Sequence, residues 1–472
     1  MGQLIASIPR TPAGNLAVRH LREHAAEQFG LSYLESLGDR LGRAELESGS
    51  VVRQLNESFH LLEVKDGGEI VAIIRVLQFH NQLEPSGARG KIDSIELNLP
   101  AELSSPTVLL DPVNHPANLV QLNIAAAKAN SVTGHGVRVA IVDSGAEGIG
   151  FVHDFYDLLS TTNQHPGKNR LIDNHGHGTT MATIIHEIAR DAEIDVVRVT
   201  DRGGMALWDV LAGICVAAID CAADITNLSL GVTNLGGKTC PFCLSLAHVR
   251  SLAFEKLLDA LAQLNWERPV WVAAVGNKGQ SSGFEYPAAY TSVMATGAVN
   301  AAQYRSRFSN YGTTGHPYYV MAPGGETLAD FKTVTEAVDS INSADHAGTS
   351  EATAYTSGVL ALLRSETAYR AKSRVDFLDA VIQNHCVAPA HSSPTPADYG
   401  AGLIRYSPPV AVGTPGTTSA SQRSTGQGGL PQFIDHGDQI AIDGINVSKD
   451  VVMELLRDLP VLKPLRFRGR DS

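Results

Sequence analysis

Apolar residues near the N-terminus recur at helical spacing, at Val18, Leu21, Ala25, Phe29, Leu34, Leu37 and Leu41. Around 59–64 and 69–79 the pattern changes to short apolar runs that are typical of strands, with Asp66-Gly67-Gly68 as the turn between them. A looser stretch rich in proline and serine then closes the segment. We therefore predict a separate N-terminal α+β unit over residues 1–118.

From 119 to 410 short apolar strands alternate with Ala-rich helices. Strands are expected at 137–142, 195–199, 225–230, 270–275 and 293–299. Helices are expected where apolar residues recur at helical spacing, at Met181, Ile184, Ile185 and Ile188, and over the run 358–363. This alternation predicts an α/β domain with a mainly parallel sheet.

The C-terminal part of the chain differs in composition from the α/β segment. Residues 411–431 are mostly Gly, Ser, Thr, Pro and Gln, which predicts a flexible linker. A tail over 432–472 follows, with an apolar helix candidate near 451–456 and a basic end at 466–470.

Composition and charge exclude some classes of function. The chain has 472 residues, of which 43% are hydrophobic and 18% charged, as in ordinary soluble globular proteins. A formal net charge of −12 argues against binding to nucleic acid. No apolar stretch approaches the roughly 18 residues of a membrane span, so no membrane partner is expected, and no pattern requires a cofactor.

The cysteines and the N-terminus bear on the compartment. Five cysteines, an odd and sparse number, suit a reducing environment. A secretory signal has a basic start and a sustained hydrophobic segment, and the first residues of this chain have neither. We therefore expect a cytoplasmic protein, provided that residue 1 is its natural start.

Ser350 is the first candidate for chemistry. It lies in Gly348-Thr349-Ser350, ahead of the apolar run 358–363. A serine at a helix start is accessible, and the free backbone N–H groups there stabilise a developing oxyanion. Gly-Thr-Ser is also common turn chemistry, so in isolation a turn is the better interpretation.

Three further polar residues stand where strands end or helices begin. Asp143 closes the strand 137–142, and Asn277 follows the strand 270–275 through a glycine. His177 begins a helical pattern, and His175 competes with it for the role of general base. Each residue alone is better explained as a turn or cap, but together they give the chain order Asp, His, Ser that the subtilisin arrangement uses.

With these residues the chain resembles the subtilisin-like serine proteases, or subtilases. Residues 136–145 look like the aspartate motif of that family, and 177–182 are similar to its histidine motif, which favours His177 over His175. Further matches follow in order at 227–231, 276–277, 286–288, 295–299, 308–310, 321–324 and 348–350. The resemblance implies a subtilisin-like three-layer fold with a mainly parallel central sheet over 119–410, besides the N-terminal α+β extension.

The resemblance also implies roles for individual residues in a serine endopeptidase. Asp143, His177 and Ser350 correspond to the catalytic set, and Asn277 to the oxyanion residue. The expected substrate-binding residues are Leu228, Ser229, Leu230, Gly231, Lys278, Gly203 and Gly204. Lys278 leads to the hypothesis that acidic or polar substrate side chains are preferred, with a solvated lysine as the alternative.

The chain departs from the family pattern at several points. Glu351 follows the nucleophile where the family usually has Met, and Ala354 replaces the usual Pro. The short segment between 177 and 195 leaves no room for the calcium-binding loop of many members. Residues 1–118 stand where secreted members carry a pro-domain. A cytoplasmic protease must be kept from cleaving the proteins of its own cell. We therefore expect its activity to be restrained by residues 1–118, by the tail 432–472, or by a regulatory partner protein.

Two alternative functions remain open at this point. A catalytically silent pseudoprotease would use the same fold only to bind peptides. A zinc metallopeptidase would use His20, Glu23 and His24, which match the pattern H-x-x-E-H. Cys240 and Cys243 form a lone C-x-x-C, for which a structural role is favoured over a redox-sensitive loop.

Overall fold

The computed structural model describes 3–7, 31–41, 58–64, 94–98, 100–103, 116–232, 252–264, 269–281, 283–312, 315–326, 347–390, 394–408, 433–435, 439–442 and 445–448. These residues belong to two compact units. One comprises Met1–Thr233 with His248–Pro409, and the other Asn234–Ala247 with Val410–Ser472. The predicted boundaries at 118, 410 and 431 stay predictions.

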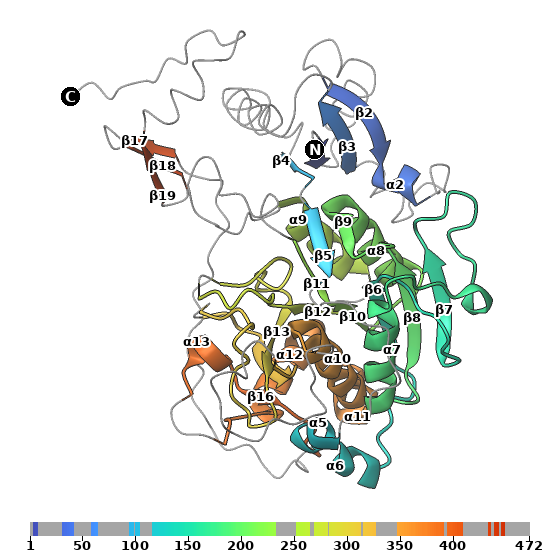
Figure 1. Ribbon diagram of the computed structural model, residues 1–472, viewed down its shortest axis with the longest axis vertical. Helices are drawn as coiled ribbons and strands as arrows, with labels where there is room; N and C mark the ends of the chain where they lie inside the picture. The colour runs from blue at the N-terminus through green and yellow to red at the C-terminus, as the bar shows by residue number, and fades with distance from the viewer. Residues whose placement is uncertain are drawn as a thin grey trace. The chain divides into compact units, whose positions relative to one another are not determined.

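The larger unit is organised around a nine-stranded sheet (Figure 1). Its strand order is β15-β16-β14-β13-β12-β10-β6-β8-β7, and all neighbouring pairs are parallel except β15–β16. The strands are β6 (Arg138–Asp143), β7 (Val152–Asp157), β8 (Glu193–Arg198), β10 (Ile225–Leu228), β12 (Val270–Ala274), β13 (Met294–Val299), β14 (Tyr319–Pro323), β15 (Cys386–Val387) and β16 (Leu403–Ile404). The predicted mainly parallel sheet is confirmed.

Helices cover both faces of this sheet. On one face Val139 and Ile141 of β6 share a hydrophobic core with α7 (His177–Ile188) and α10 (Thr349–Ser365). The opposite face packs against α8 (Leu207–Ile219), where a Cβ at Gly213 would lie 2.5 Å from Val142 Cγ1. Because Ile141 and Val142 are consecutive strand residues, they point to opposite faces. The result is the predicted three-layer arrangement.

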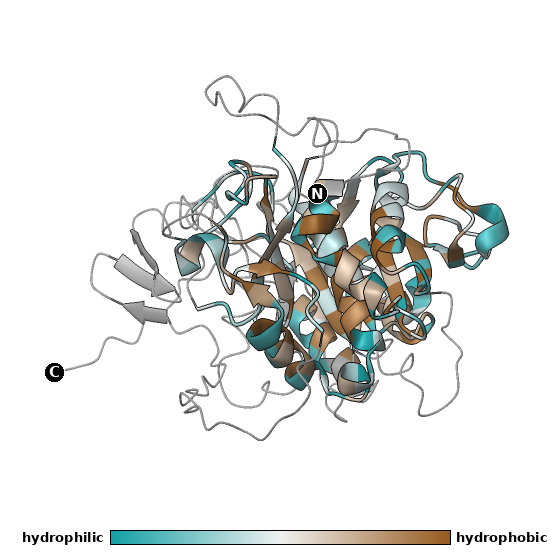
Figure 2. Ribbon diagram, turned by 90° about the horizontal axis from the view of Figure 1, so that it is seen from below, coloured by the Kyte–Doolittle hydropathy of each residue, from teal (hydrophilic) through white to brown (hydrophobic). Residues whose placement is uncertain are grey.

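The remaining helices among the described residues of 116–408 complete the layers and the connections. They are α5 (Pro116–Gln121), α6 (Ile124–Ala129), η1 (Lys168–Arg170), α9 (Leu252–Leu264), α11 (Thr367–Arg370), α12 (Arg374–Asn384) and α13 (Pro396–Tyr399). Figure 2 shows the hydrophobic residues on the strands and on the inner sides of the helices. Among the described residues, no helix is long and apolar enough to span a membrane.

The N-terminal segment contains a four-stranded antiparallel sheet. Its order is β2-β3-β1-β4, from β1 (Gln3–Ser7), β2 (Leu31–Ser36), β3 (Phe59–Val64) and β4 (Ser94–Leu97). The expected strand at 59–64 is confirmed, whereas 69–79 and the helical pattern from Val18 to Phe29 lie outside the described residues.

The helical pattern predicted through Leu34 is wrong. Leu34 belongs to β2, which pairs with β3, and its side chain is 41% exposed rather than part of a helix core. A helix starts only at α2 (Leu37–Arg40), where Ser36 and Asp39 form a capping box. Pairing with a distant strand has therefore overridden a local periodicity.

A second small sheet lies beside the carboxyl end of β10. The strand predicted over 225–230 is in fact two strands, β10 and β11 (Leu230–Val232), separated at Ser229. β11 pairs with β5 (Pro100–Leu103), which also pairs with β9 (Gly204–Ala206), and both pairings are antiparallel. The strand β5 therefore lies between β11 and β9.

The smaller unit has an antiparallel sheet of β17 (Phe433–Asp435), β18 (Gln439–Ile442) and β19 (Ile445–Ser448). The predicted linker 411–431 and the helix candidate 451–456 lie outside the described residues.

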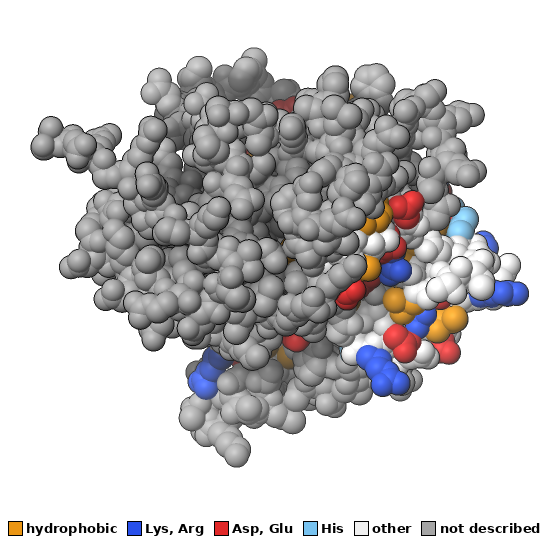
Figure 3. All heavy atoms as spheres, turned by 90° about the horizontal axis from the view of Figure 1, so that it is seen from above, with side chains coloured by type: hydrophobic (Ala, Val, Ile, Leu, Met, Phe, Trp, Pro, Cys, Tyr) orange, Lys and Arg blue, Asp and Glu red, His pale blue; other side chains and the backbone are white. Residues whose placement is uncertain are grey.

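On the face drawn in Figure 3, acidic and basic side chains of the described residues are interspersed.

Candidate active site

Asp143 and His177 form the centre of the site. Asp143 is the last residue of β6 and is fully buried, and His177 is the first residue of α7. His177 Nδ1 lies 2.8 Å from Asp143 Oδ1 and 2.9 Å from Oδ2. Gly176, which precedes the helix, has a φ of 86°, a left-handed conformation that suits glycine. Strand and helix thus bring the two side chains together.

Burial and charge have opposite effects on the His177 imidazole. Burial disfavours the charged ring, but the charges of Asp143, Glu351 and Asp173 outweigh it and raise the pKa of His177. The other ring nitrogen, Nε2, is buried and has no hydrogen-bond partner among the described residues. His177 is therefore held through Nδ1, with Nε2 available to accept a proton.

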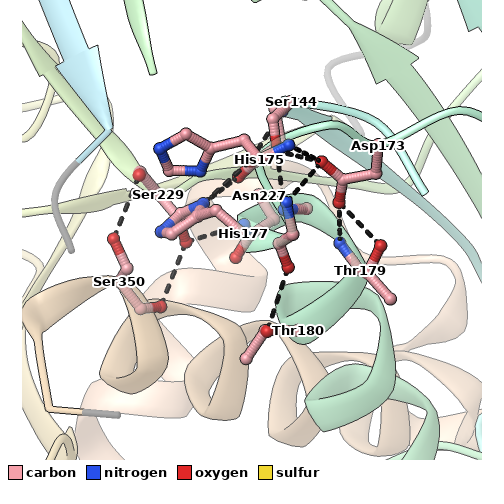
Figure 4. Close-up of polar contacts among 12 residues, drawn as sticks. Ser144, Asp173, His175, His177, Thr179, Thr180, Asn227, Ser229 and Ser350 are labelled. Carbon is pink, nitrogen blue, oxygen red and sulfur yellow. Dashed lines mark hydrogen bonds and ion pairs between the residues drawn. The ribbon is translucent and has the colours of Figure 1, made fainter. Parts of the chain in front are cut away.

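Ser350 lies in the first turn of α10, which packs against α7. The residue is fully buried, and its hydroxyl donates a hydrogen bond of 3.0 Å to the Ser229 carbonyl (Figure 4). The hydroxyl is thus directed to Ser229 and not to His177 Nε2. Its position at a helix N-terminus gives it backbone N–H groups that have no partner within the helix.

Asn277 is oriented by the residue before Ser350. It follows β12 through Gly276, whose φ is 100°. Asn277 Oδ1 accepts hydrogen bonds of 2.9 Å from both the backbone N and the Oγ1 of Thr349. Because the oxygen end of the amide is held by Thr349, the Nδ2 group faces away from Thr349 and is able to donate to another acceptor. Sequence reasoning did not assign this role to Thr349.

A second carboxylate supports the Asp143–His177 pair and was missed from the sequence. Asp173 is 1% exposed and accepts hydrogen bonds from Gly176 N (2.7 Å) and Thr179 N (2.9 Å) at the start of α7. It also accepts from Ser144 Oγ (2.8 Å), while Ser144 N donates to Asp143 Oδ1 (2.7 Å). Asp173 thereby connects the start of α7 to the end of β6.

A chain of buried polar side chains fixes the nucleophile helix to β10. Ser357 Oγ donates to Asn227 Oδ1 at 3.0 Å, and Asn227 Nδ2 donates to Ser229 Oγ at 2.9 Å. Ser229 Oγ in turn donates to the Ser350 carbonyl at 3.0 Å. Together with the Ser350 hydroxyl, these bonds determine the position of Ser350 relative to Ser229.

His175, the alternative to His177, does not contact Asp143 in this way. Its backbone N donates to Asp173 Oδ1 at 3.1 Å, and its ring lies edge-on to His177 with 6.1 Å between the centroids. Burial lowers the pKa of His175, and the neighbouring His177 adds to this effect. The structure thus pairs Asp143 with His177.

Four of the expected substrate-binding residues flank β5, Leu230 and Gly231 on one side and Gly203 and Gly204 on the other. Leu228 ends β10, while Leu230 and Gly231 belong to β11 and pair with Leu103 and Glu102 of β5. On the other side Gly204 pairs with Glu102, and the Gly203 carbonyl accepts a hydrogen bond of 3.0 Å from Leu103 N. The edges that were expected to bind substrate are therefore occupied by the chain's own residues 100–103.

Lys278 is not simply a solvated lysine. Its ammonium lies 2.7 Å from Glu285 Oε1, and the side chain of Glu285 is 8% exposed. The preference for acidic or polar side chains inferred from Lys278 stays a prediction, and the positive charge on which it depends is paired with a carboxylate.

Other residues with candidate chemistry lie outside the described part. These are His20, Glu23 and His24, and likewise Cys240 and Cys243. Among the described cysteines, Cys215 and Cys221 are buried and Cys386 is partly buried.

The comparisons with known proteins agree on one family. The model of the Subtilase family matches residues 134–428. The minor extracellular protease Epr of Bacillus subtilis (strain 168) is 27% identical over 300 residues, which cover 61% of this chain and 41% of that protein. An alkaline protease of Alkalihalobacillus alcalophilus is 25% identical over 421 residues, covering 86% of this chain and 97% of the relative.

A solved structure shows the same fold. Fervidolysin from Fervidobacterium pennivorans, described as a keratinolytic enzyme related to subtilisin, superposes with a TM-score of 0.56 at 17% identity. The match covers 86% of this chain and 60% of fervidolysin. The likeness supports the predicted subtilisin-like three-layer fold.

Proposed function

The chain belongs to the subtilase family of serine endopeptidases, and from this premise we propose that Asp143, His177 and Ser350 hydrolyse peptide bonds through an acyl-enzyme. The observation that carries the proposal is the contact of His177 Nδ1 with both oxygens of Asp143, while the buried Nε2 has no hydrogen-bond partner in the part of the chain that the structure describes. An imidazole held through one nitrogen and open at the other suits a general base. The substrates are peptides or proteins.

Each group has a role in the reaction. The Ser350 hydroxyl rotates from the Ser229 carbonyl to His177 Nε2, gives up its proton and attacks the substrate carbonyl. Asp143 keeps the proton on Nδ1 and stabilises the imidazolium that forms. The oxyanion is stabilised by Asn277 Nδ2, whose amide is oriented by Thr349, and by the Ser350 backbone N–H. The imidazolium then donates its proton to the leaving amine as the peptide C–N bond breaks, and water hydrolyses the resulting ester.

A fluorophosphonate tests this function on the full chain. We expect one covalent adduct per chain at Ser350, with parallel loss of casein hydrolysis, and no effect of a metal chelator. Peptide binding without labelling or hydrolysis favours the pseudoprotease. Hydrolysis that a chelator abolishes and the fluorophosphonate spares favours the zinc site at His20, Glu23 and His24. Peptide mapping of the adduct identifies the serine.

We further propose that the segment 1–118 is a pro- or regulatory domain that restrains the enzyme. Its strand β5 takes the position between β11 and β9 where an extended peptide would add a strand. Two contacts to the start of α8 support this assignment: Trp208 Nε1 donates to Glu35 Oε1 at 2.8 Å, and Arg40 pairs with Asp209 at 2.9 Å.

Weakening β5 is expected to increase activity. Leu103→Pro removes the N–H that donates to the Gly203 carbonyl, and the loss of one such bond corresponds to about fivefold in an equilibrium. We expect casein hydrolysis by the full chain to rise about fivefold or more. The matched variant Leu103→Ala keeps the N–H and should stimulate less. Equal activity of both variants and the unchanged chain would assign restraint to the tail 432–472 or to a regulatory partner protein.

The cytoplasmic location remains a proposal. It is supported by the odd and sparse cysteines, five in 472 residues, which suit a reducing environment. The relative Epr is named an extracellular protease, which describes that protein. Finding the protein in the medium of its native cells, and not in their lysate, would contradict the proposal.

A further inference from the structure

Glu285 is a buried carboxylate beside the proposed oxyanion residue. It is 6% exposed, and its backbone N donates to Val275 O at 3.0 Å, at the end of β12. Two glycines make room for its side chain. A Cβ at Gly276 would lie 2.6 Å from Glu285 Cδ, and a Cβ at Gly231 would overlap Glu285 Oε2. The carboxylate thus lies between β11 and the residue before Asn277.

Lys278 neutralises this carboxylate from a more exposed position. Its Nζ lies 2.7 Å from Glu285 Oε1, and its side chain is 45% exposed, compared with 8% for that of Glu285. A lysine that is almost half in water can leave for solvent at little cost, whereas the buried carboxylate cannot. Burial raises the pKa of Glu285, Lys278 opposes this effect, and Glu102 adds to it. The site needs a cation, and Lys278 is a replaceable one.

The register of β5 shows how an extended substrate would align with β11. Glu102 lies opposite Gly231, and Leu103 lies opposite Leu230. In the same register the next substrate residue lies opposite Ser229, because antiparallel partners advance one residue at a time.

That next residue is the one whose carbonyl is attacked, because the Ser229 carbonyl accepts the hydrogen bond of the Ser350 hydroxyl. Side chains alternate along a strand, so its side chain points to the same face as that of Glu102. Glu102 lies opposite Gly231, and a Cβ at Gly231 would overlap Glu285 Oε2, so this face of the pairing is directed toward Glu285. The side chain of the attacked residue therefore approaches Glu285.

On the basis of the proposed function, we propose that Glu285 selects substrates with Lys or Arg at the residue whose carbonyl is attacked. The substrate cation replaces Lys278, which moves into water, so the buried carboxylate keeps a positive partner. A substrate Glu or Asp brings a second carboxylate to the same place, which is disfavoured. This inference reverses the preference for acidic side chains that Lys278 alone suggested.

A competition assay with matched peptides in one reaction mixture measures the preference for the side chain of the attacked residue. The peptides differ only in Lys, Gln or Glu at the attacked residue, and their relative rates of consumption give the ratio of kcat/KM values. The ratio is independent of the fraction of full-length chain that β5 keeps closed, since all peptides compete for the same open enzyme. We expect kcat/KM for the Lys peptide to exceed that for the Gln peptide by about tenfold or more, and kcat/KM for the Gln peptide to exceed that for the Glu peptide.

The variants assign the preference to Glu285. In Glu285→Gln the Lys-to-Gln ratio should fall about tenfold, and in Lys278→Met it should rise because the internal competitor is gone. Glu193→Gln removes an exposed carboxylate that pairs with Arg138 on the outer part of the sheet, so it should leave the ratio unchanged.

Two results would overturn the inference, and they are separable from failure of the proposed function. An unchanged ratio in Glu285→Gln contradicts the role of Glu285. Faster cleavage of the Glu peptide than of the Lys peptide by the unaltered chain contradicts it without any variant, so a misfolded variant does not decide the matter. Absence of cleavage of all peptides, together with absence of fluorophosphonate labelling, overturns the proposed function and the inference with it.

Discussion

Replacing Ser350 by Ala is expected to reduce kcat/KM for a peptide substrate by about a millionfold. The substitution removes the only atom that forms the acyl-enzyme in the proposed mechanism, and neither His177 nor Asn277 is able to replace it. The remaining rate would come from binding and from the oxyanion donors alone. Replacing Ser350 and His177 together should lower kcat/KM little further than replacing Ser350 alone, because the two residues act as a unit.

The measurement is a peptide-hydrolysis assay on full-length protein, with fluorophosphonate labelling as a second readout. Ser365→Ala is the matched control, since Ser365 lies at the other end of α10 and its hydroxyl donates to the Leu362 carbonyl. It should retain activity within about twofold, as surface-side substitutions usually do. Undiminished hydrolysis by Ser350→Ala would exclude Ser350 as the nucleophile.

The strands at the centre of the sheet were predictable because of their burial. Every residue of β12 and β13 is buried, and neither strand contains a charged residue. β12 appears in the sequence as an uninterrupted hydrophobic run, and in β13 only Thr296 and Gly297 interrupt it. Edge strand β7 (Val152–Asp157) contains exposed His153 and partly exposed Asp154, which breaks such a run, and it was not predicted. Local pattern therefore identifies central strands better than edges.

β5 shows a second limit of local pattern. Its residues begin with Pro100 in a stretch rich in proline and serine, which predicts an irregular segment. In the structure they form a strand because β11 and β9 supply hydrogen-bonding partners on both sides. The pairing joins residues more than a hundred positions apart, so no periodicity within 100–103 indicates it.

In the site, too, local sequence pattern identified some residues and missed those whose role depends on distant contacts. Asp143 and His177 were found through short motifs at a strand end and a helix start. Asp173 was missed because its role depends on Ser144, Gly176 and Thr179, which turns bring together. The pairing of Lys278 with Glu285 also requires the folded chain, and it changes the substrate preference that Lys278 alone suggests.

Replacing Asp143 by Asn is expected to lower kcat/KM by about ten-thousandfold while Ser350 stays in place. An asparagine amide is able to donate to His177 Nδ1, which would put the imidazole proton on Nε2. That nitrogen could then no longer accept the proton of Ser350. The amide also leaves the imidazolium without the buried counter-charge that lies 2.8 Å away in the unaltered chain. The expected loss thus has a tautomeric and an electrostatic cause.

The pH profile separates this role from a general loss of structure. In the unaltered chain Asp143 contributes to a raised pKa of His177, so kcat/KM should increase with pH through a midpoint above the usual value of about 6.5, as the imidazole becomes neutral. Without the charge of Asp143, burial dominates, the pKa falls, and the acid limb of the residual activity moves to lower pH.

Asp195→Asn is the matched control for this prediction. Asp195 is also buried, and it pairs with a histidine, His153, at 2.7 Å, but on strand β8 and away from Ser350. It should leave the acid limb where it is, since its carboxylate is not among the charges that raise the pKa of His177. If Asp143→Asn retained kcat/KM within about threefold and the same acid limb, a base other than His177 would have to activate Ser350. His175 is the nearest alternative, because its ring lies 6.1 Å from that of His177.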